Sequence, residues 1–105
     1  MAALLDELNI NYETQKQLQW EYGWKYFDFY LPDFNILLEV DGTYWHGKDL
    51  SINELDDRQA HTRQNDEIKT IIAAEQGYDL IRIWSDEINV TMLNNKINKV
   101  TNGYK

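Results

Sequence analysis

The chain has 105 residues, enough for one domain with one modest core, and 43% hydrophobic content with 13% aromatic residues excludes an intrinsically disordered protein. The absence of cysteine excludes disulfides and thiolate metal sites, and the lack of a long apolar run or a signal-peptide pattern predicts a cytoplasmic protein with no membrane partner. The formal net charge of −8 argues against a nucleic-acid partner, although the segment after Ile88 carries lysines and no acids.

The order of helices and strands follows from hydrophobic periodicity and turn residues. Apolar residues three and four positions apart predict helices, and apolar residues at every second position predict strands. In chain order, the pattern predicts a helix over 2–8, strands over 12–20, 26–31 and 36–41, a helical turn within 50–55, a long helix over 57–75, a strand over 78–84 and a helix over 86–100. This order predicts a single α/β domain over 1–105, with helices flanking a mixed β-sheet in two or three layers.

The second and third predicted strands carry acidic residues in apolar surroundings. They are joined by a Pro-Asp-Phe-Asn sequence, which is typical of a turn. Alternation places Phe27 and Phe29 on one face of the second strand and Asp28 on the other, while Glu39 and Asp41 share a face of the third. If the two strands pair as a hairpin, the three carboxylates can lie side by side.

A cation would explain this gathering of acids. Aspartate is depleted in strands, and like charges held together cost free energy unless something neutralises them. A hard cation with oxygen ligands, such as Mg²⁺ or Mn²⁺, does so. His46 follows Asp41 by five residues and can reach the same place.

Several short motifs follow one another in a fairly specific order. They are FDFYLP around Asp28, EVDG over 39–42, YWHG over 44–47 and GYDLIRIW over 77–84, with Asp66 between the last two. This set resembles the PD-(D/E)XK nucleases, in particular the branch shared by very-short-patch-repair endonucleases and EDxHD phage homing endonucleases. The resemblance covers most of the chain and implies a restriction-endonuclease-like fold.

The resemblance also implies a site. Its catalytic residues would be Asp28, Glu39, Asp41, His46 and Asp66. Asp28, Glu39 and the main-chain carbonyl of Val40 would bind the metal ion. His46 would act as a general base or contact the scissile phosphate, and Asp66 would orient His46 or hold the metal through water. For Asp66 the alternative is a solvated helix residue paired with Lys69, and Asp41 with Gly42 could simply form a turn.

Two positions depart from the family pattern. The lysine that usually follows the second acid after one residue is absent, because Asp41 occupies that place. The glutamate expected on the first helix is also absent, and Glu7, the nearest substitute, stands in the wrong register. The role of the missing lysine, stabilising charge or helping to deprotonate water, must therefore be filled by another group.

Further residues are candidates for contact with DNA. Trp45 could stack on bases, although a place in the core is equally compatible with its side chain. The candidate phosphate contacts are Arg63, Lys69, Arg82, Lys96 and Lys99.

These observations predict a metal-dependent endonuclease that hydrolyses phosphodiester bonds in double-stranded DNA. The resemblance implies a phage or mobile-element homing enzyme, active in a bacterial or phage-infected cell, more than a repair enzyme. Cutting both strands with one site per chain would require a homodimer. The alternatives are a non-enzymatic acidic binding module on the same fold and a nuclease for RNA or DNA ends.

Overall fold

Three consecutive strands and one later strand build the sheet around which this protein folds. A computed structural model describes residues 1–44 and 46–101 of the chain. Its elements are α1 (Ala2–Glu7), β1 (Glu13–Trp20), β2 (Gly23–Leu31), β3 (Ile36–Asp41), the short 3-10 helix η1 (Ile52–Glu54), α2 (Asp57–Glu75), β4 (Asp79–Trp84) and α3 (Val90–Thr101).

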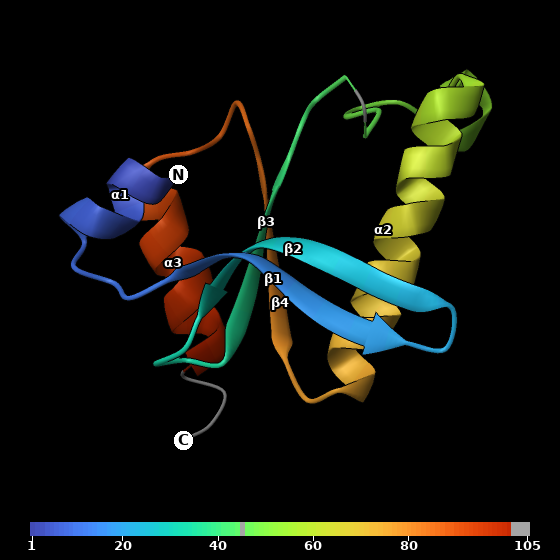
Figure 1. Ribbon diagram of the computed structural model, residues 1–105. Helices are drawn as coiled ribbons and strands as arrows, with labels where there is room; N and C mark the ends of the chain where they lie inside the picture. The colour runs from blue at the N-terminus through green and yellow to red at the C-terminus, as the bar shows by residue number, and fades with distance from the viewer. Residues whose placement is uncertain (45, 102–105) are drawn as a thin grey trace.

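The sheet is mixed. Its spatial order is β1-β2-β3-β4, in which β1, β2 and β3 form an antiparallel meander and β4 lies parallel to β3. A parallel neighbour needs a crossover connection, and α2 lies within the segment that connects β3 to β4 (Figure 1). The described residues therefore confirm the predicted α/β domain with a mixed sheet and flanking helices.

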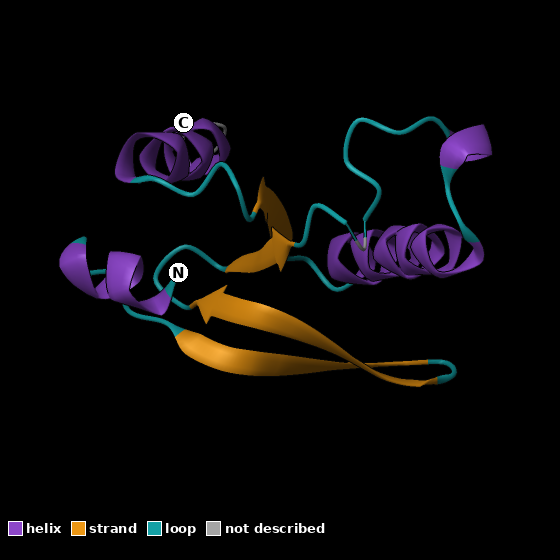
Figure 2. Cartoon of the chain, turned by 90° about the horizontal axis from the view of Figure 1, so that it is seen from above, coloured by secondary structure: helices purple, strands orange, loops and turns teal. Residues whose placement is uncertain are grey.

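Helices cover both faces of the sheet. Figures 1 and 2 show α1 and α3 on one side and α2 on the other. On the first side, Leu5 of α1 and Leu93 of α3 pack with Leu38 of β3, and all three are fully buried. On the second side, Ile72 of α2 packs against Leu37 of β3. The protein thus has three layers with an apolar cluster on each face, and β3 contributes to both.

The second strand departs from the predicted alternation at Asp28. Phe29 packs in the cluster beneath α1 and α3, as expected for its face, but Phe27 packs in the cluster beneath α2. The backbone pairing between β2 and β3 ends at Phe29. Beyond it, the Asp28 side chain accepts a hydrogen bond from the backbone N–H of Val40 at 2.8 Å. On the other side, Gln15 of β1 has a φ of +51°. The prediction that Phe27 and Phe29 share a face is therefore wrong, because the strand does not keep its regular alternation at Asp28 and the two side chains lie on opposite faces of the sheet.

The long helix begins and ends where the sequence predicts. Asp56 accepts the N–H of Gln59, and the Gln59 side chain accepts the N–H of Asp56, which completes a capping box. Gly77 follows the helix with a φ of +87°, a conformation that favours glycine at a helix end.

No helix in the described part of the chain is long and apolar enough to cross a membrane.

The last helix begins later than predicted. The apolar pattern extends back to residue 86, but α3 starts at Val90. The Asn89 side chain accepts the backbone N–H of Met92 at 2.8 Å, so Asn89 caps the helix and excludes residues 86–89 from it.

Candidate active site

The predicted acids converge at the end of β3, on the face that α2 covers. Glu39 and Asp41 are two residues apart and therefore point to the same side of the sheet. Both are buried, with exposed fractions of 5% and 6%. The helix α2, which covers this face of the sheet, supplies Asp66 and Lys69. These two residues lie one helical turn apart on one side of the helix.

One half of the site contains Asp28, Glu39 and Lys69. The Lys69 ammonium forms an ion pair with Glu39 Oε1, and it also lies 4.7 Å from the centre of the Phe27 ring. Burial raises the pKa of Glu39 to about 7; the ion pair with Lys69 lowers it, and the neighbouring Asp28 carboxylate raises it again. Asp28 in turn is held in place by the N–H of Val40. This half of the site thus consists of two neighbouring carboxyl groups, those of Asp28 and Glu39, and the Lys69 ammonium, which forms an ion pair with Glu39.

The other half contains Asp41, His46, Asp66 and Arg82. His46 Nδ1 is hydrogen-bonded to Asp66 Oδ2, and His46 Nε2 lies 3.7 Å from Asp41 Oδ1. The Arg82 guanidinium reaches Asp41 at 3.1 Å and Asp66 at 3.4 Å. Burial raises the pKa of Asp41, and the neighbouring Arg82 and His46 side chains act in the opposite direction. Asp66 therefore pairs with His46 and Arg82 and not with Lys69.

A single arginine holds the loop that carries His46. Arg63 Nε donates to the carbonyl oxygen of His46 at 2.9 Å. Its Nη2 donates to the carbonyl oxygens of Gly47 and Leu50 at 2.7 and 3.0 Å. The described residues between β3 and η1 form turns, whose hydrogen bonds satisfy several backbone N–H groups, and Arg63 from α2 satisfies three of the carbonyl oxygens.

Two further contacts anchor the same loop. Gln59 Nε2, from the first turn of α2, donates to the carbonyl oxygen of Tyr44 at 2.6 Å. Lys48 Nζ donates to the carboxylates of Asp86 and Glu87 at 2.9 and 3.1 Å. Together with Arg63, these contacts fix the position of His46 between α2 and the segment after β4.

The contacts of Lys69, Arg82 and Arg63 were not evident from the sequence. The sequence predicts phosphate contacts for all three, whereas their charged groups face carboxylates or carbonyl oxygens of the protein itself. For Lys69 a signal was present, because it lies three and four positions before the buried Ile72 and Ala73, on the side of α2 that packs on the sheet. Lys69 thus brings an ammonium to Glu39 from α2.

The other predicted DNA contacts lie elsewhere. Lys96 and Lys99 of α3 line a cavity of about 170 Å³ together with Val100, and neither forms an ion pair within residues 1–44 and 46–101. Trp45 lies outside the described residues. Glu7, the nearest substitute for the missing glutamate, is exposed at the end of α1, in the layer on the other side of the sheet from α2.

Two groups of side chains at this site carry atoms that could serve as ligands for a divalent cation. The side-chain oxygens and ring nitrogens of Asp41, His46 and Asp66 include one set of ligand atoms within 4.8 Å of one another. The Asp28–Glu39 pair offers only oxygen ligands, which Mg²⁺ and Mn²⁺ prefer, whereas an imidazole is also a ligand for transition metals. Burial raises the pKa of Glu39, and the Lys69 ammonium already supplies one positive charge beside this carboxyl.

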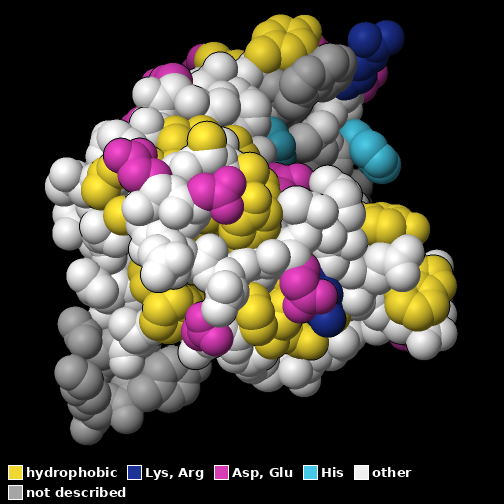
Figure 3. Space-filling view, turned by 60° about the vertical axis from the view of Figure 1, so that its left-hand side comes forward, with side chains coloured by type: hydrophobic (Ala, Val, Ile, Leu, Met, Phe, Trp, Pro, Cys, Tyr) yellow, Lys and Arg dark blue, Asp and Glu magenta, His cyan; other side chains and the backbone are white. Residues whose placement is uncertain are grey.

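The surface matches the acidic composition. On the face drawn in Figure 3, acidic side chains are scattered among hydrophobic ones and few basic side chains are visible.

Comparison of the sequence with models of known protein families finds no match, and comparison with curated proteins finds none either.

Proposed function

We propose that this protein is a metal-dependent nuclease that hydrolyses phosphodiester bonds in double-stranded DNA. The observation that carries the proposal is the convergence of Asp28, Glu39, Asp41, His46 and Asp66 on one face of the sheet, beneath one helix. Three of these side chains come from two strands, one from a loop and one from α2, so their meeting is a property of the tertiary fold.

The candidate metal ligands are Asp28, Glu39 and the carbonyl oxygen of Val40. A Mg²⁺ or Mn²⁺ ion held there would polarise the phosphate and lower the pKa of a bound water. His46 is suited to accept a proton, because a neutral ring that donates from Nδ1 to Asp66 leaves Nε2 as the acceptor. Lys69 is suited to stabilise negative charge on the phosphate, because its ammonium already lies at Glu39.

The finer fold assignment is part of the proposal. A helix, a three-stranded antiparallel meander, a second helix and a parallel fourth strand support the restriction-endonuclease-like fold that the sequence motifs imply. The same motifs favour a phage or mobile-element enzyme in a bacterial cytoplasm, and a dimer if both DNA strands are cut. Lys96 and Lys99 are the predicted phosphate contacts whose charges are not paired within the described residues.

One observation favours a second function, a non-enzymatic acidic binding module. Arg63, Lys69 and Arg82 contact acids or carbonyl oxygens of the protein itself, which leaves a chain of net charge −8 with few cations for a phosphate backbone. Such a module would keep the same fold and would not need a divalent ion. A nuclease for RNA or for DNA ends would use the same site on another substrate.

A nicking assay separates these functions. Supercoiled plasmid is incubated with the purified protein in Mg²⁺, in Mn²⁺ and in EDTA, and RNA and linear DNA are tested in parallel. We expect open-circular product with either metal and none with EDTA. The matched control is Asp28→Asn, which keeps an oxygen to accept the N–H of Val40 and removes only the charge. The absence of metal-dependent cleavage of every substrate, or equal cleavage by Asp28→Asn, would contradict the proposal.

A further inference from the structure

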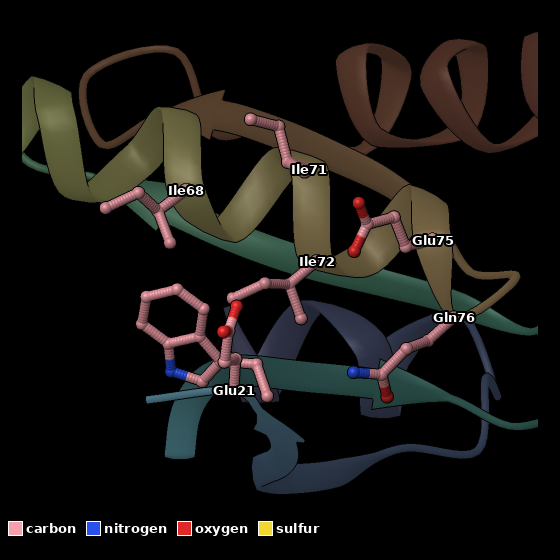
Figure 4. A pocket seen from close by; sticks show the side chains of 7 residues that line it. Glu21, Ile68, Ile71, Ile72, Glu75 and Gln76 are labelled. Carbon is pink, nitrogen blue, oxygen red and sulfur yellow. The ribbon is translucent and has the colours of Figure 1, made fainter. Parts of the chain in front are cut away.

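An open groove lies beside α2, and none of the candidate active-site residues lines it. It runs between the β1–β2 turn and the C-terminal half of α2 and has a volume of about 310 Å³ (Figure 4). Its walls are the indole of Trp20 and the aliphatic side chains of Ile68, Ile71 and Ile72. Each wall residue belongs to a regular element, so the groove is part of the fold and not of a loop.

The groove is fixed in shape and open to solvent. Gln76 Nε2 donates to the carbonyl oxygen of Gln19 at 2.7 Å and ties the end of α2 to the hairpin. Tyr22, at the hairpin turn, packs edge-on against Trp20 with ring centres 5.0 Å apart. Ile71, which lines the groove, is nevertheless 57% exposed, and Tyr22 beside Trp20 is 76% exposed, so apolar surface at and next to the groove is open to solvent.

Two carboxylates stand at the rim of this apolar groove. Glu21 lines it from the hairpin turn and Glu75 lines it from the last turn of α2, and Figure 4 shows both among the side chains around the groove. Within residues 1–44 and 46–101, neither of these two carboxylate groups forms a hydrogen bond or an ion pair. An apolar wall with acidic groups at its edge is complementary to a side chain that is aliphatic along its length and positive at its end.

We propose that this groove binds a basic segment of a partner protein, with an arginine or lysine side chain as its anchor. The aliphatic stem would lie against Trp20 and Ile72, and the charged head would lie between Glu21 and Glu75. A purely apolar segment would leave the two carboxylates beside desolvated surface, and an acidic segment or a nucleic acid would meet like charge. The inference does not depend on the nuclease activity, because none of these residues belongs to the candidate active site.

A pair of capped peptides tests the charge requirement. Both carry one central residue between two leucines; in one this residue is arginine, and in the other it is citrulline, which has nearly the same shape and no charge. Each is titrated into the ¹⁵N-labelled full chain at low salt. We expect the arginine peptide to shift the Trp20 indole signal and the amides of 68–76 and to bind more tightly than the citrulline peptide. Equal affinity for both peptides would overturn the proposal.

Variants locate the binding. Replacing both rim acids, Glu21→Gln with Glu75→Gln, should weaken binding of the arginine peptide roughly 2- to 30-fold, the range for two exposed ion pairs. Ile71→Ala should weaken it as well, and the fold tolerates this change because Ile71 is exposed. The control is Glu13→Gln, an exposed acid at the far end of β1, which should have no effect.

Three further outcomes would overturn the proposal. If Glu13→Gln weakens binding as much as the rim variant, the attraction comes from net charge and not from the groove. If the wild-type chain dimerises by sedimentation and Ile71→Ala makes it monomeric, the occupant is a second copy. If a DNA or RNA oligonucleotide shifts the same signals more strongly than the arginine peptide, the surface binds nucleic acid.

Discussion

The metal-free protein should lose stability as the pH rises from mildly acidic to neutral, because of Glu39. Burial raises the pKa of this carboxyl from an ordinary value near 4.5 to about 7. Between these values the folded state keeps the proton and the unfolded state has released it. Because the folded state binds more protons in this window, the free energy of unfolding falls with rising pH. This direction is opposite to that of a carboxylate whose pKa is lowered in the folded state.

The size of the effect follows from the pKa. Each pH unit between the two values is worth about 1.4 kcal/mol. From pH 4.5 to pH 7 the contribution of Glu39 to stability should therefore fall by about 3 kcal/mol. In a domain of this size each kcal/mol moves Tm by roughly 4–8 °C, so Tm should fall by roughly 12–25 °C from this group alone. The raised pKa of Asp41 acts in the same direction.

The assay compares wild type with Glu39→Gln by urea denaturation in EDTA, from pH 4.5 to pH 8. The amide keeps the shape of the carboxyl and cannot ionise, so the variant should show a much flatter dependence on pH. Glu39→Gln also loses the ion pair with Lys69, which lowers the free energy of unfolding at high pH. This loss does not restore the dependence of stability on pH that the wild type shows. If wild type and variant lose stability in parallel between pH 4.5 and pH 7, Glu39 is already ionised in the folded state and the reasoning from burial is wrong.

Further predictions concern the metal, the imidazole and the loop. A divalent ion at about hundredfold excess over its Kd should add about 2.7 kcal/mol of stability at pH 8, measured as Tm at matched ionic strength, and much less in Asp28→Asn; equal Tm with monovalent salt would argue against metal binding by the free protein. His46→Ala should lower the nicking rate by roughly 10²- to 10⁴-fold with little change in metal affinity by calorimetry, and an unchanged rate would remove His46 from the chemistry. Arg63→Lys cannot reproduce the three-carbonyl contact, so hydrogen exchange of residues 46–50 should accelerate while the sheet amides keep their protection; uniform acceleration would mean that Arg63 stabilises the whole fold.

Local signals in the sequence were sufficient for much of the fold. The strand Ile36–Asp41 and the helix Asp57–Glu75 have the predicted bounds, because an alternating apolar run ends at Gly42 and a 3.6-residue period ends at Gly77. The start of α3 was wrong because one hydrogen bond from Asn89 outweighs the apolar pattern that precedes it. At a helix end, the free energy gained from a capping hydrogen bond is similar to that gained by adding a further turn of apolar residues, so the apolar pattern alone does not fix where the helix begins.

The candidate site was predictable only in part. Strand alternation was enough to place Glu39 and Asp41 on one face, because that rule is local. The partners of Lys69 and Arg82 depend on how α2 crosses the sheet and how β4 aligns with β3, which no local pattern gives. The register aligns Glu39 with Arg82, so a basic residue beside the acids is a consequence of the parallel pairing.

That parallel pairing also determines when the acids of the site acquire their counter-charges during folding. The β2–β3 hairpin is local, whereas β4 and α2 can reach β3 only after a long segment has been ordered, which is slow. A chain that has formed only the β1–β3 meander holds Asp28, Glu39 and Asp41 together without Lys69 or Arg82. Their repulsion should therefore belong to the folding barrier, and moderate salt or mildly acidic pH should accelerate refolding more than it slows unfolding.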